Sequence, residues 1–310
     1  MFDGFRLEQV RLISARLRVR VGGSGPAILL LHGHPRTHVT WHKVADLLVK
    51  DHTVVCPDLR GFGQSSIPDD TTDHSGSSKR AKAQDCIELM HYLGFDRFAA
   101  VGHDRGSYTA FRLAMDHPAA VSRLMILDGV PILEALERCD ARFAAAWWHW
   151  FFFAQPDKPE RAISAAPEQW YGGSPGEMGE EAYADYLEAI RNPEIVRGMI
   201  EDYRAGLSID YLHDAEDRRL GRRVQCPMAV LWSLKDDLEA LYGDILAVWK
   251  PWAGSTLTGK GLPSGHHMAE EIPDMLAFEI NAFVAPDRAA IPVDWFRHDI
   301  TRSRVDLRAP

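Results

Sequence analysis

The chain has 310 residues, of which 46% are hydrophobic and 25% charged, as expected for one large domain or a domain carrying an inserted module. A net charge of -9 argues against a nucleic-acid-binding protein, although local cations can still bind a small anion. The four cysteines are scattered without a CxxC pair, and no apolar run suits a signal peptide or a membrane span. These features predict a cytoplasmic protein that does not enter membranes.

The first part of the chain alternates between predicted strands and helices. Strands are expected over residues 11–21, 27–31, 53–56, 98–101 and 121–127, from polar–apolar alternation or short apolar runs. Helical periodicity is expected over residues 41–49, 79–93 and 107–115. This alternation is typical of an α/β protein with a mostly parallel, doubly wound sheet and helices on both faces.

A long helical stretch then interrupts the strand pattern. Residues 131–222 are rich in aromatic side chains and contain no convincing strand, whereas strands return near 228–232 and 255–258 and a helix near 270–284. We therefore predict a core formed by residues 1–130 and 223–284 with a helical cap formed by 131–222. Residues 285–310 form a C-terminal extension, either packed on the body or partly disordered.

The segment Gly102-His-Asp-Arg-Gly106 lies between a predicted strand and a predicted helix. This is the arrangement of a nucleophile elbow, in which a sharp turn exposes the middle side chain at the carboxyl end of the sheet. The middle residue here is Asp104 instead of the usual serine. The simpler alternative is an aspartate that only caps the following helix.

An ionised aspartate can displace a leaving group from a saturated carbon without a general base, forming an ester on the enzyme. A second step must hydrolyse that ester, which requires a histidine to activate water. The segment 264–270 offers His266, which we favour, and its neighbour His267. The acid that orients the histidine is Asp128 or one of Asp236 and Asp237, and the residues alone leave this choice open.

An oxyanion hole is expected from the backbone N–H groups of His34, after an early strand, and Arg105. The histidines near this strand also suggest a metal site formed by His32, His34, His38 and His42. Because this spacing has neither an HExxH helix nor a carboxylate partner, we predict no metal.

Several motifs together carry a family resemblance: LLLHGHP, DLRGFGQSS, VGHDRG, AWWHWFFFAQP, EDYRAG and SGHHMAEEIP. In this order, over residues 8–284, the chain resembles the haloacetate (fluoroacetate) dehalogenases of the α/β-hydrolase superfamily. The resemblance implies Asp104 as nucleophile, Asp128 as acid and His266 as base. It also implies a homodimer that uses water and an anionic haloacid, with no cofactor.

The same resemblance implies a halide pocket in the cap, with His149, Trp150 and Tyr203 as hydrogen-bond donors. Arg105 is expected to bind the substrate carboxylate. The chain departs from the family pattern at Tyr108, where the family has a second carboxylate-binding arginine four residues after the nucleophile. We expect one guanidinium and one phenol to bind the carboxylate here.

The sequence therefore predicts hydrolysis of the carbon–halogen bond of a small 2-haloacid. The alternative is an epoxide hydrolase with the same Asp-His-Asp machinery, in which a cap tyrosine such as Tyr203 protonates the epoxide oxygen. Arg105 argues against that alternative, because a neutral epoxide gains little from its charge. A non-catalytic ligand receptor on the same fold is the third possibility.

Overall fold

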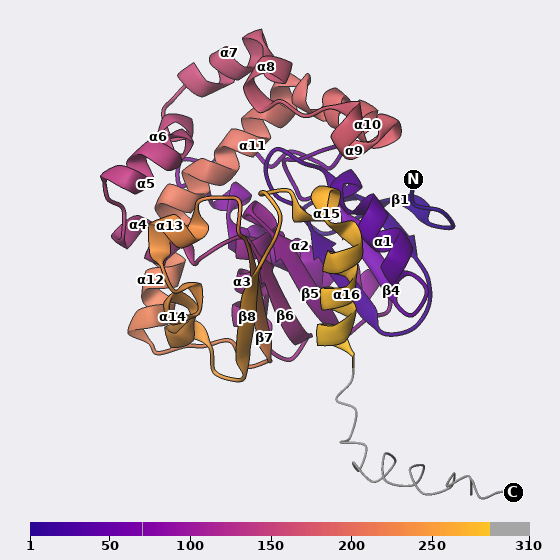
Figure 1. Ribbon diagram of the computed structural model, residues 1–310. Coiled ribbons are helices and arrows are strands. Elements are labelled where there is room, and N and C mark those ends of the chain that lie inside the picture. The colour runs from indigo at the N-terminus through magenta and orange to yellow at the C-terminus, as the bar shows by residue number, and fades with distance from the viewer. Residues whose placement is uncertain (70, 286–310) are drawn as a thin grey trace, which may run out of the picture.

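A computed structural model describes residues 1–69 and 71–285 (Figure 1). Eight strands form one sheet in the order β1-β2-β4-β3-β5-β6-β7-β8, in which β2 runs antiparallel to both neighbours and all other pairs are parallel. The strands are β1 (Arg6–Arg11), β2 (Arg16–Gly22), β3 (Ala27–Leu31), β4 (Thr53–Pro57), β5 (Phe98–His103), β6 (Val121–Leu127), β7 (Met228–Ser233) and β8 (Leu257–Leu262). The predicted α/β class is confirmed.

Strands β3, β4 and β5 are buried along their whole length, as their continuous apolar runs require. The crossover from β3 to β4 runs in the opposite direction to those from β4 to β5 and from β5 to β6. Right-handed crossovers therefore place α1 (His42–Leu48) on one face of the sheet and α2 (Lys79–Tyr92) and α3 (Arg105–Asp116) on the other. The carboxyl ends of the parallel strands are left open to loops.

Two predicted boundaries were wrong. The single strand expected over residues 11–21 is a hairpin of β1 and β2, closed by a bond from Leu12 N–H to the carbonyl of Ala15. That turn contains none of the glycine, proline or asparagine residues that usually mark one, so the alternation reads as continuous. The helix expected over 270–284 is divided into α15 (Met268–Glu271) and α16 (Pro273–Val284), because Pro273 cannot donate a backbone hydrogen bond to a preceding turn.

Between β6 and β7 the chain forms a series of helices, most of them separated by short turns, from Ile132 to Arg219. They are α4 (Ile132–Glu137), α5 (Ala141–Ala146), α6 (Trp148–Phe153), α7 (Lys158–Ala165), α8 (Pro167–Tyr171), α9 (Pro175–Met178), α10 (Glu180–Ile190), α11 (Pro193–Ala205), the π-helical η3 (Gly206–Asp210) and α12 (Tyr211–Arg219). In Figure 1 the helices from α6 to α11, in magenta to salmon, lie over one end of the sheet, whereas α12 lies beside the sheet next to α14 (Ile245–Trp249). The division of these helices from the core as a separate cap remains a prediction, and residues 286–310 of the predicted extension lie outside the described residues.

After β7 the chain forms α13 (Leu238–Tyr242), α14 (Ile245–Trp249) and η4 (Lys250–Trp252) before it enters β8. Two short helices precede α1 and α2: η1 (His38–Trp41) and η2 (Ser75–Ser77). Among residues 1–69 and 71–285, no helix combines the length and apolar character needed to cross a membrane.

Candidate active site

The strand β5 passes into α3 through one residue, Asp104, whose φ of 49° and ψ of -120° are unusual for a non-glycine residue. The glycines on either side make this turn possible. A Cβ at Gly102 would lie 2.3 Å from the carbonyl oxygen of Gly106, and a Cβ at Gly106 would lie 2.3 Å from that of Leu31. The Gly-x-Asp-x-Gly spacing is therefore a steric requirement of the turn, and the turn exposes Asp104 at the carboxyl end of β5.

The loop after β3 approaches the Asp104 carboxylate directly. The backbone N–H of His34 donates to Asp104 Oδ1 at 2.6 Å. This approach needs Gly33, because a Cβ there would lie 2.3 Å from the same oxygen. The structure thus brings one of the two predicted oxyanion donors to the carboxylate, while the N–H of Arg105 belongs to the first residue of α3.

His266 lies on the opposite side of Asp104. Its Nε2 is 3.9 Å from Asp104 Oδ2, and its Nδ1 is 2.7 Å from Asp128 Oδ2 and 3.1 Å from Asp236 Oδ2. Asp128 is held in turn by Ser233, whose backbone N–H and hydroxyl donate to the carboxylate at 3.0 and 3.1 Å. The structure therefore places His266 between the elbow aspartate and two of the three acids that sequence reasoning left open.

The protonation of the three neighbouring histidines differs because their partners differ. Burial opposes a charge on His266, but hydrogen bonds to Asp128 and Asp236 outweigh it and raise its pKa well above the usual range. Burial instead lowers the pKa of His103 to about 3 and that of His267 well below its usual value. The neutral His103 then donates through Nε2 to the carbonyl oxygen of His266 at 2.7 Å, which fixes the loop that carries His266.

A cavity of about 270 Å³ opens over these side chains. Its lining comes from the segments that follow β5, β6, β7 and β8, from α3, and from α5 and α6. The lining residues are Asp104, Tyr108, Asp128, Ala146, Trp147, His149, Trp150, Asp236, Asp237, Leu238 and His266. Such a volume suits a small molecule.

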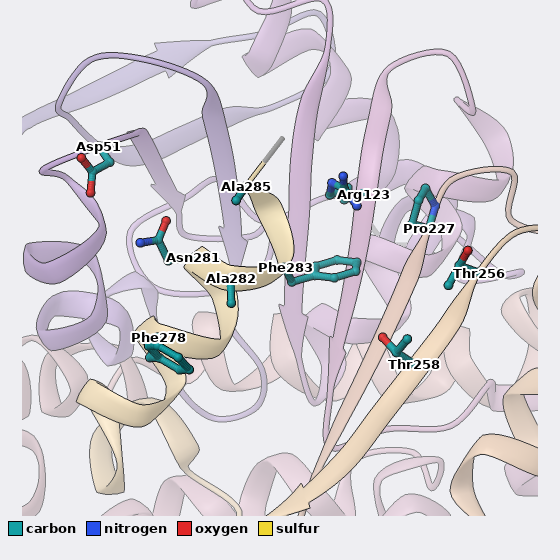
Figure 2. A pocket seen from close by; sticks show the side chains of 10 residues that line it. All are labelled: Asp51, Arg123, Pro227, Thr256, Thr258, Phe278, Asn281, Ala282, Phe283 and Ala285. Carbon is teal, nitrogen blue, oxygen red and sulfur yellow. The ribbon is translucent and has the colours of Figure 1, made fainter. Parts of the chain in front are cut away.

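A larger cavity, of about 1000 Å³, lies at the amino ends of β6, β7 and β8, beside the end of α16 (Figure 2). Its lining comprises Asp51, Arg123, Pro227, Thr256, Thr258, Phe278, Asn281, Ala282, Phe283 and Ala285. None of the predicted site residues lines it. Ligands of open parallel sheets bind outside the carboxyl ends of the strands, so the smaller cavity is the candidate active site.

Two of the three predicted halide donors line the small cavity. His149 and Trp150 belong to α6, and burial lowers the pKa of His149 to about 4, so its ring is neutral near pH 7. Tyr203 of α11 is outside the lining and packs edge-on against both, with ring centroids 5.8 Å from His149 and 6.1 Å from Trp150. Burial raises the pKa of the Tyr203 phenol, which keeps its O–H proton in place.

Arg105 is buried, and most of its hydrogen-bonding capacity is already used. Its Nε donates to Asp202 Oδ2 at 2.5 Å and its Nη2 to the Asp202 carbonyl at 2.8 Å. Its Nη1 has no hydrogen-bond partner among the described residues. The guanidinium carbon lies 4.1 Å from the centroid of the Tyr203 ring and 5.2 Å from that of Tyr108. Arg105 thus lies behind the cavity wall, whereas Tyr108 forms part of the wall.

Sequence reasoning did not identify Asp202 as a partner of Arg105. Asp202 Oδ1 also accepts hydrogen bonds from Lys79 at 2.7 Å and Lys82 at 2.6 Å, and Asp210 lies 3.5 Å from Lys79. Three cations and two carboxylates are therefore buried together. The one signal in the sequence was the position of Asp202 next to Tyr203 in EDYRAG.

The structure does not gather the four early histidines into a metal site. His32 contacts the carbonyl of Gly33, His38 the carboxylate of Asp58, and His42 the carbonyl of Met178. Within the described residues, the grouping close enough for a metal is His103, Asp128 and His266. Hydrogen bonds already engage all three side chains: His103 donates to the backbone carbonyl of His266, and His266 Nδ1 donates to Asp128.

Trp147 and Asp237 form a further contact at the cavity that the sequence did not predict. The indole N–H of Trp147 donates to both carboxylate oxygens of Asp237, at 3.0 and 2.9 Å. The residue between α5 and α6 is thereby joined to the loop after β7, so these two segments close the cavity together.

Comparison with known proteins agrees with this geometry. Residues 26–162 match the α/β hydrolase fold family. The chain is 40% identical to a fluoroacetate dehalogenase from Burkholderia sp., over 94% of this chain and 97% of that protein. It is 31% identical to a soluble epoxide hydrolase from Corynebacterium sp. (strain C12), over 93% and 96% of the two chains.

Solved structures of similar proteins have the same fold. Protein ALR0039 from Nostoc sp. PCC 7120 superposes with a TM-score of 0.88 at 40% identity, covering 92% of this chain and 99% of that one. The epoxide hydrolase CorEH superposes with a TM-score of 0.80 at 29% identity, over 90% and 98% of the two chains. The chain therefore belongs to the α/β-hydrolase family and, within it, to the hydrolases that resemble haloacetate dehalogenase.

Proposed function

We propose that the protein hydrolyses the carbon–halogen bond of a small 2-haloacid through an ester on Asp104. One observation carries the proposal: an aspartate occupies the elbow with its Oδ1 bound by a backbone N–H and its Oδ2 3.9 Å from a histidine. A serine nucleophile needs a histidine to remove its proton. A carboxylate needs no such base, so His266 is available for water.

In the first step, Asp104 Oδ2 attacks the carbon that bears the halogen. A carbon–oxygen bond forms, the carbon–halogen bond breaks, and the halide leaves with the bonding electron pair. The His34 N–H on Oδ1 leaves the second oxygen as the attacking atom. The cavity lining of His149 and Trp150 supports these side chains as halide donors, with the protonated Tyr203 behind them.

In the second step, His266 Nε2 removes a proton from water, and the oxygen of that water attacks the carbonyl carbon of the ester. Negative charge then develops on Oδ1, where the N–H of His34 can stabilise it. As this intermediate collapses, the bond between its central carbon and the alkoxide oxygen breaks, and the alkoxide takes a proton from the His266 imidazolium to leave as a 2-hydroxyacid. The Asp104 carboxyl group then loses its proton and is a carboxylate again. The sum is haloacid plus water giving hydroxyacid, halide and a proton, and Asp128 stabilises the imidazolium formed on the way.

The substrate carboxylate is assigned to Arg105 through its unpartnered Nη1, with Tyr108 as a second donor from the wall. Arg105 is neutralised only in part. The cluster behind it contains three cations, Arg105, Lys79 and Lys82, against two carboxylates. The cavity lining itself carries the carboxylates of Asp104, Asp128, Asp236 and Asp237, so the support for an anion is the unpartnered Nη1 of Arg105 and not the net charge of the site.

The soluble epoxide hydrolase relative supports a second candidate, in which Asp104 opens an epoxide and a tyrosine protonates the leaving oxygen. The two activities differ in their products. A haloacid gives free halide, whereas an epoxide gives a diol. A halide-release screen of haloacetates and bulkier 2-haloacids, run beside a diol assay, distinguishes them, and turnover of either kind excludes the receptor function.

The test of the mechanism is intact-mass measurement of two variants. Asp104→Asn should show no turnover, because a neutral amide cannot form the ester. His266→Asn should still complete the first step and should then accumulate a covalent adduct on Asp104. An adduct in His267→Asn but not in His266→Asn would refute the choice of base, and full activity in intact Asp104→Asn would refute the nucleophile.

We also propose a cytoplasmic homodimer. All four cysteines are free, three of them buried, which suits a reducing compartment. Trp148 on α6 is 51% exposed, and a partner's cap would bury it. Light scattering of the wild type and of Trp148→Glu tests this, since a monomeric wild type would refute the dimer.

A further inference from the structure

The imidazole of His266 has one Nδ1–H group and two carboxylates within reach of it. Asp128 Oδ2 lies at 2.7 Å and Asp236 Oδ2 at 3.1 Å. Both are within the range of a hydrogen bond between nitrogen and oxygen. The acids come from the loops after two adjacent parallel strands, because β6 and β7 pair up to Leu127 and Leu231. Neighbouring strand ends thus deliver two acids to one histidine.

The two acids have different surroundings. Asp128 is buried and accepts two further hydrogen bonds from Ser233. The side chain of Asp236 is 32% exposed and lines the cavity. Asp128 is therefore the rigid partner, and Asp236 is the partner that solvent and substrate can reach.

We propose that Asp236 is a second acid for His266, which shares its Nδ1–H with Asp128, stabilises the imidazolium and partly replaces Asp128 when that residue is removed. Asp236 is a positioning residue, since it acts on the reaction only through His266. Its effect on catalysis rests on the proposed function. Its effect on the charge of His266 does not.

The other ionisable groups around His266 set the background for this effect. Asp104 faces Nε2 at 3.9 Å, and the rings of His103 and His267 lie 4.7 and 5.2 Å from the His266 ring. Burial keeps both of those histidines uncharged. Asp237 is directed to the indole of Trp147. The groups in direct contact with Nδ1 are thus Asp128 and Asp236.

The second acid affects the second step of the reaction, in which His266 activates water to hydrolyse the ester. Once Asp104 carries the alkyl group it has no charge, so Asp128 and Asp236 remain to stabilise the imidazolium. The interaction acts on both partners: it raises the pKa of His266 and lowers the pKa of Asp236, because it stabilises the charged form of each. Removing the Asp236 charge should lower the pKa of His266, so that it becomes a competent base at lower pH.

The direct test is a titration of His266 by NMR in protein with ¹⁵N-labelled histidine, with its signal assigned by loss in His266→Asn. Asp236→Asn should lower its pKa by roughly one unit, the usual size of a shift from one close carboxylate. Asp236→Glu keeps the charge and should keep most of the shift. Asp237→Asn is the matched control at the adjacent position, and it should move the titration less. An unchanged titration in Asp236→Asn would overturn the proposal.

The kinetic test uses a double-mutant cycle. Asp128→Asn should retain at least roughly tenfold more halide release than Asp128→Asn/Asp236→Asn, because Asp236 still orients the ring in the single variant. Equal activities in those two proteins would refute the replacement role. The NMR titration needs no substrate, so a protein that releases no halide at all would refute the proposed function while the shared hydrogen bond is still tested.

Discussion

Replacing Asp202 with asparagine should destabilise the protein strongly, because this one carboxylate is bound by three buried cations. The asparagine side chain would have the same shape but no charge. Lys79 would keep its contact with Asp210, and Arg105 and Lys82 would lose their carboxylate partner. Removal of one member of a buried ion pair costs about 3–5 kcal/mol of unfolding free energy. At about 2 °C per kcal/mol for a chain of this size, Tm should fall by roughly 6–10 °C.

The loss should also depend on pH. Burial and the neighbouring Arg105 lower the pKa of Lys79 to about 8, below its unfolded value of about 10.4. Without Asp202 this folded-state pKa falls further. At pH 6 the variant must keep Lys79 charged without its partner, whereas at pH 9 the amine is neutral in both folded proteins. The stability difference between wild type and Asp202→Asn should therefore shrink from pH 6 to pH 9.

Thermal and urea unfolding followed by circular dichroism, at both pH values, measure these effects. Glu8→Gln is the control, because Glu8 pairs with Arg6 at the surface and should contribute less than about 1 kcal/mol. A loss below about 1 kcal/mol in Asp202→Asn would show that this carboxylate does not hold the cations. A loss that stays the same from pH 6 to pH 9 would show that Lys79 does not relieve the excess charge.

Three further predictions concern catalysis. His149→Ala and Trp150→Phe should slow fluoride release more than bromide release, because fluoride needs more hydrogen bonding as it leaves. Equal losses for the two halides in a halide-release assay would indicate that these two side chains have a purely structural role. Tyr108→Arg should raise kcat/KM for fluoroacetate roughly tenfold to a hundredfold, because a charge-assisted hydrogen bond to the substrate carboxylate contributes ~1.5–3 kcal/mol. If steady-state kinetics show no gain, Arg105 alone suffices to bind that carboxylate. Because the pKa of His266 is raised, its ring stays protonated in acid and cannot take a proton from water. The wild type should therefore accumulate the Asp104 adduct as pH falls, and intact-mass spectra that show no adduct in acid would refute this order of steps.

The sequence by itself determined those features that depend only on residues close together along the chain. The buried strand Ala27–Leu31 was predicted to the residue, because a continuous apolar run needs cover on both faces. The elbow at Asp104 was predicted for a similar reason, since its two flanking glycines are a local steric requirement. The hairpin at Leu12–Ala15 was missed because its turn carries no glycine, proline, asparagine or aspartate, and the single serine, Ser14, is a weaker turn signal.

The tertiary structure decided which side chains each functional group meets. Arg105 was predicted to face the substrate carboxylate, but folding pairs its Nε and Nη2 with Asp202, 97 residues away, and leaves Nη1 unpartnered among the described residues. Likewise, the pattern of residues left Asp128 and Asp236 as alternative acids, and the fold brings both to His266 Nδ1. These contacts join distant segments, and their strength depends on burial and on distances of a few ångström. Only the packing of helices on the sheet and of strand beside strand determines those distances.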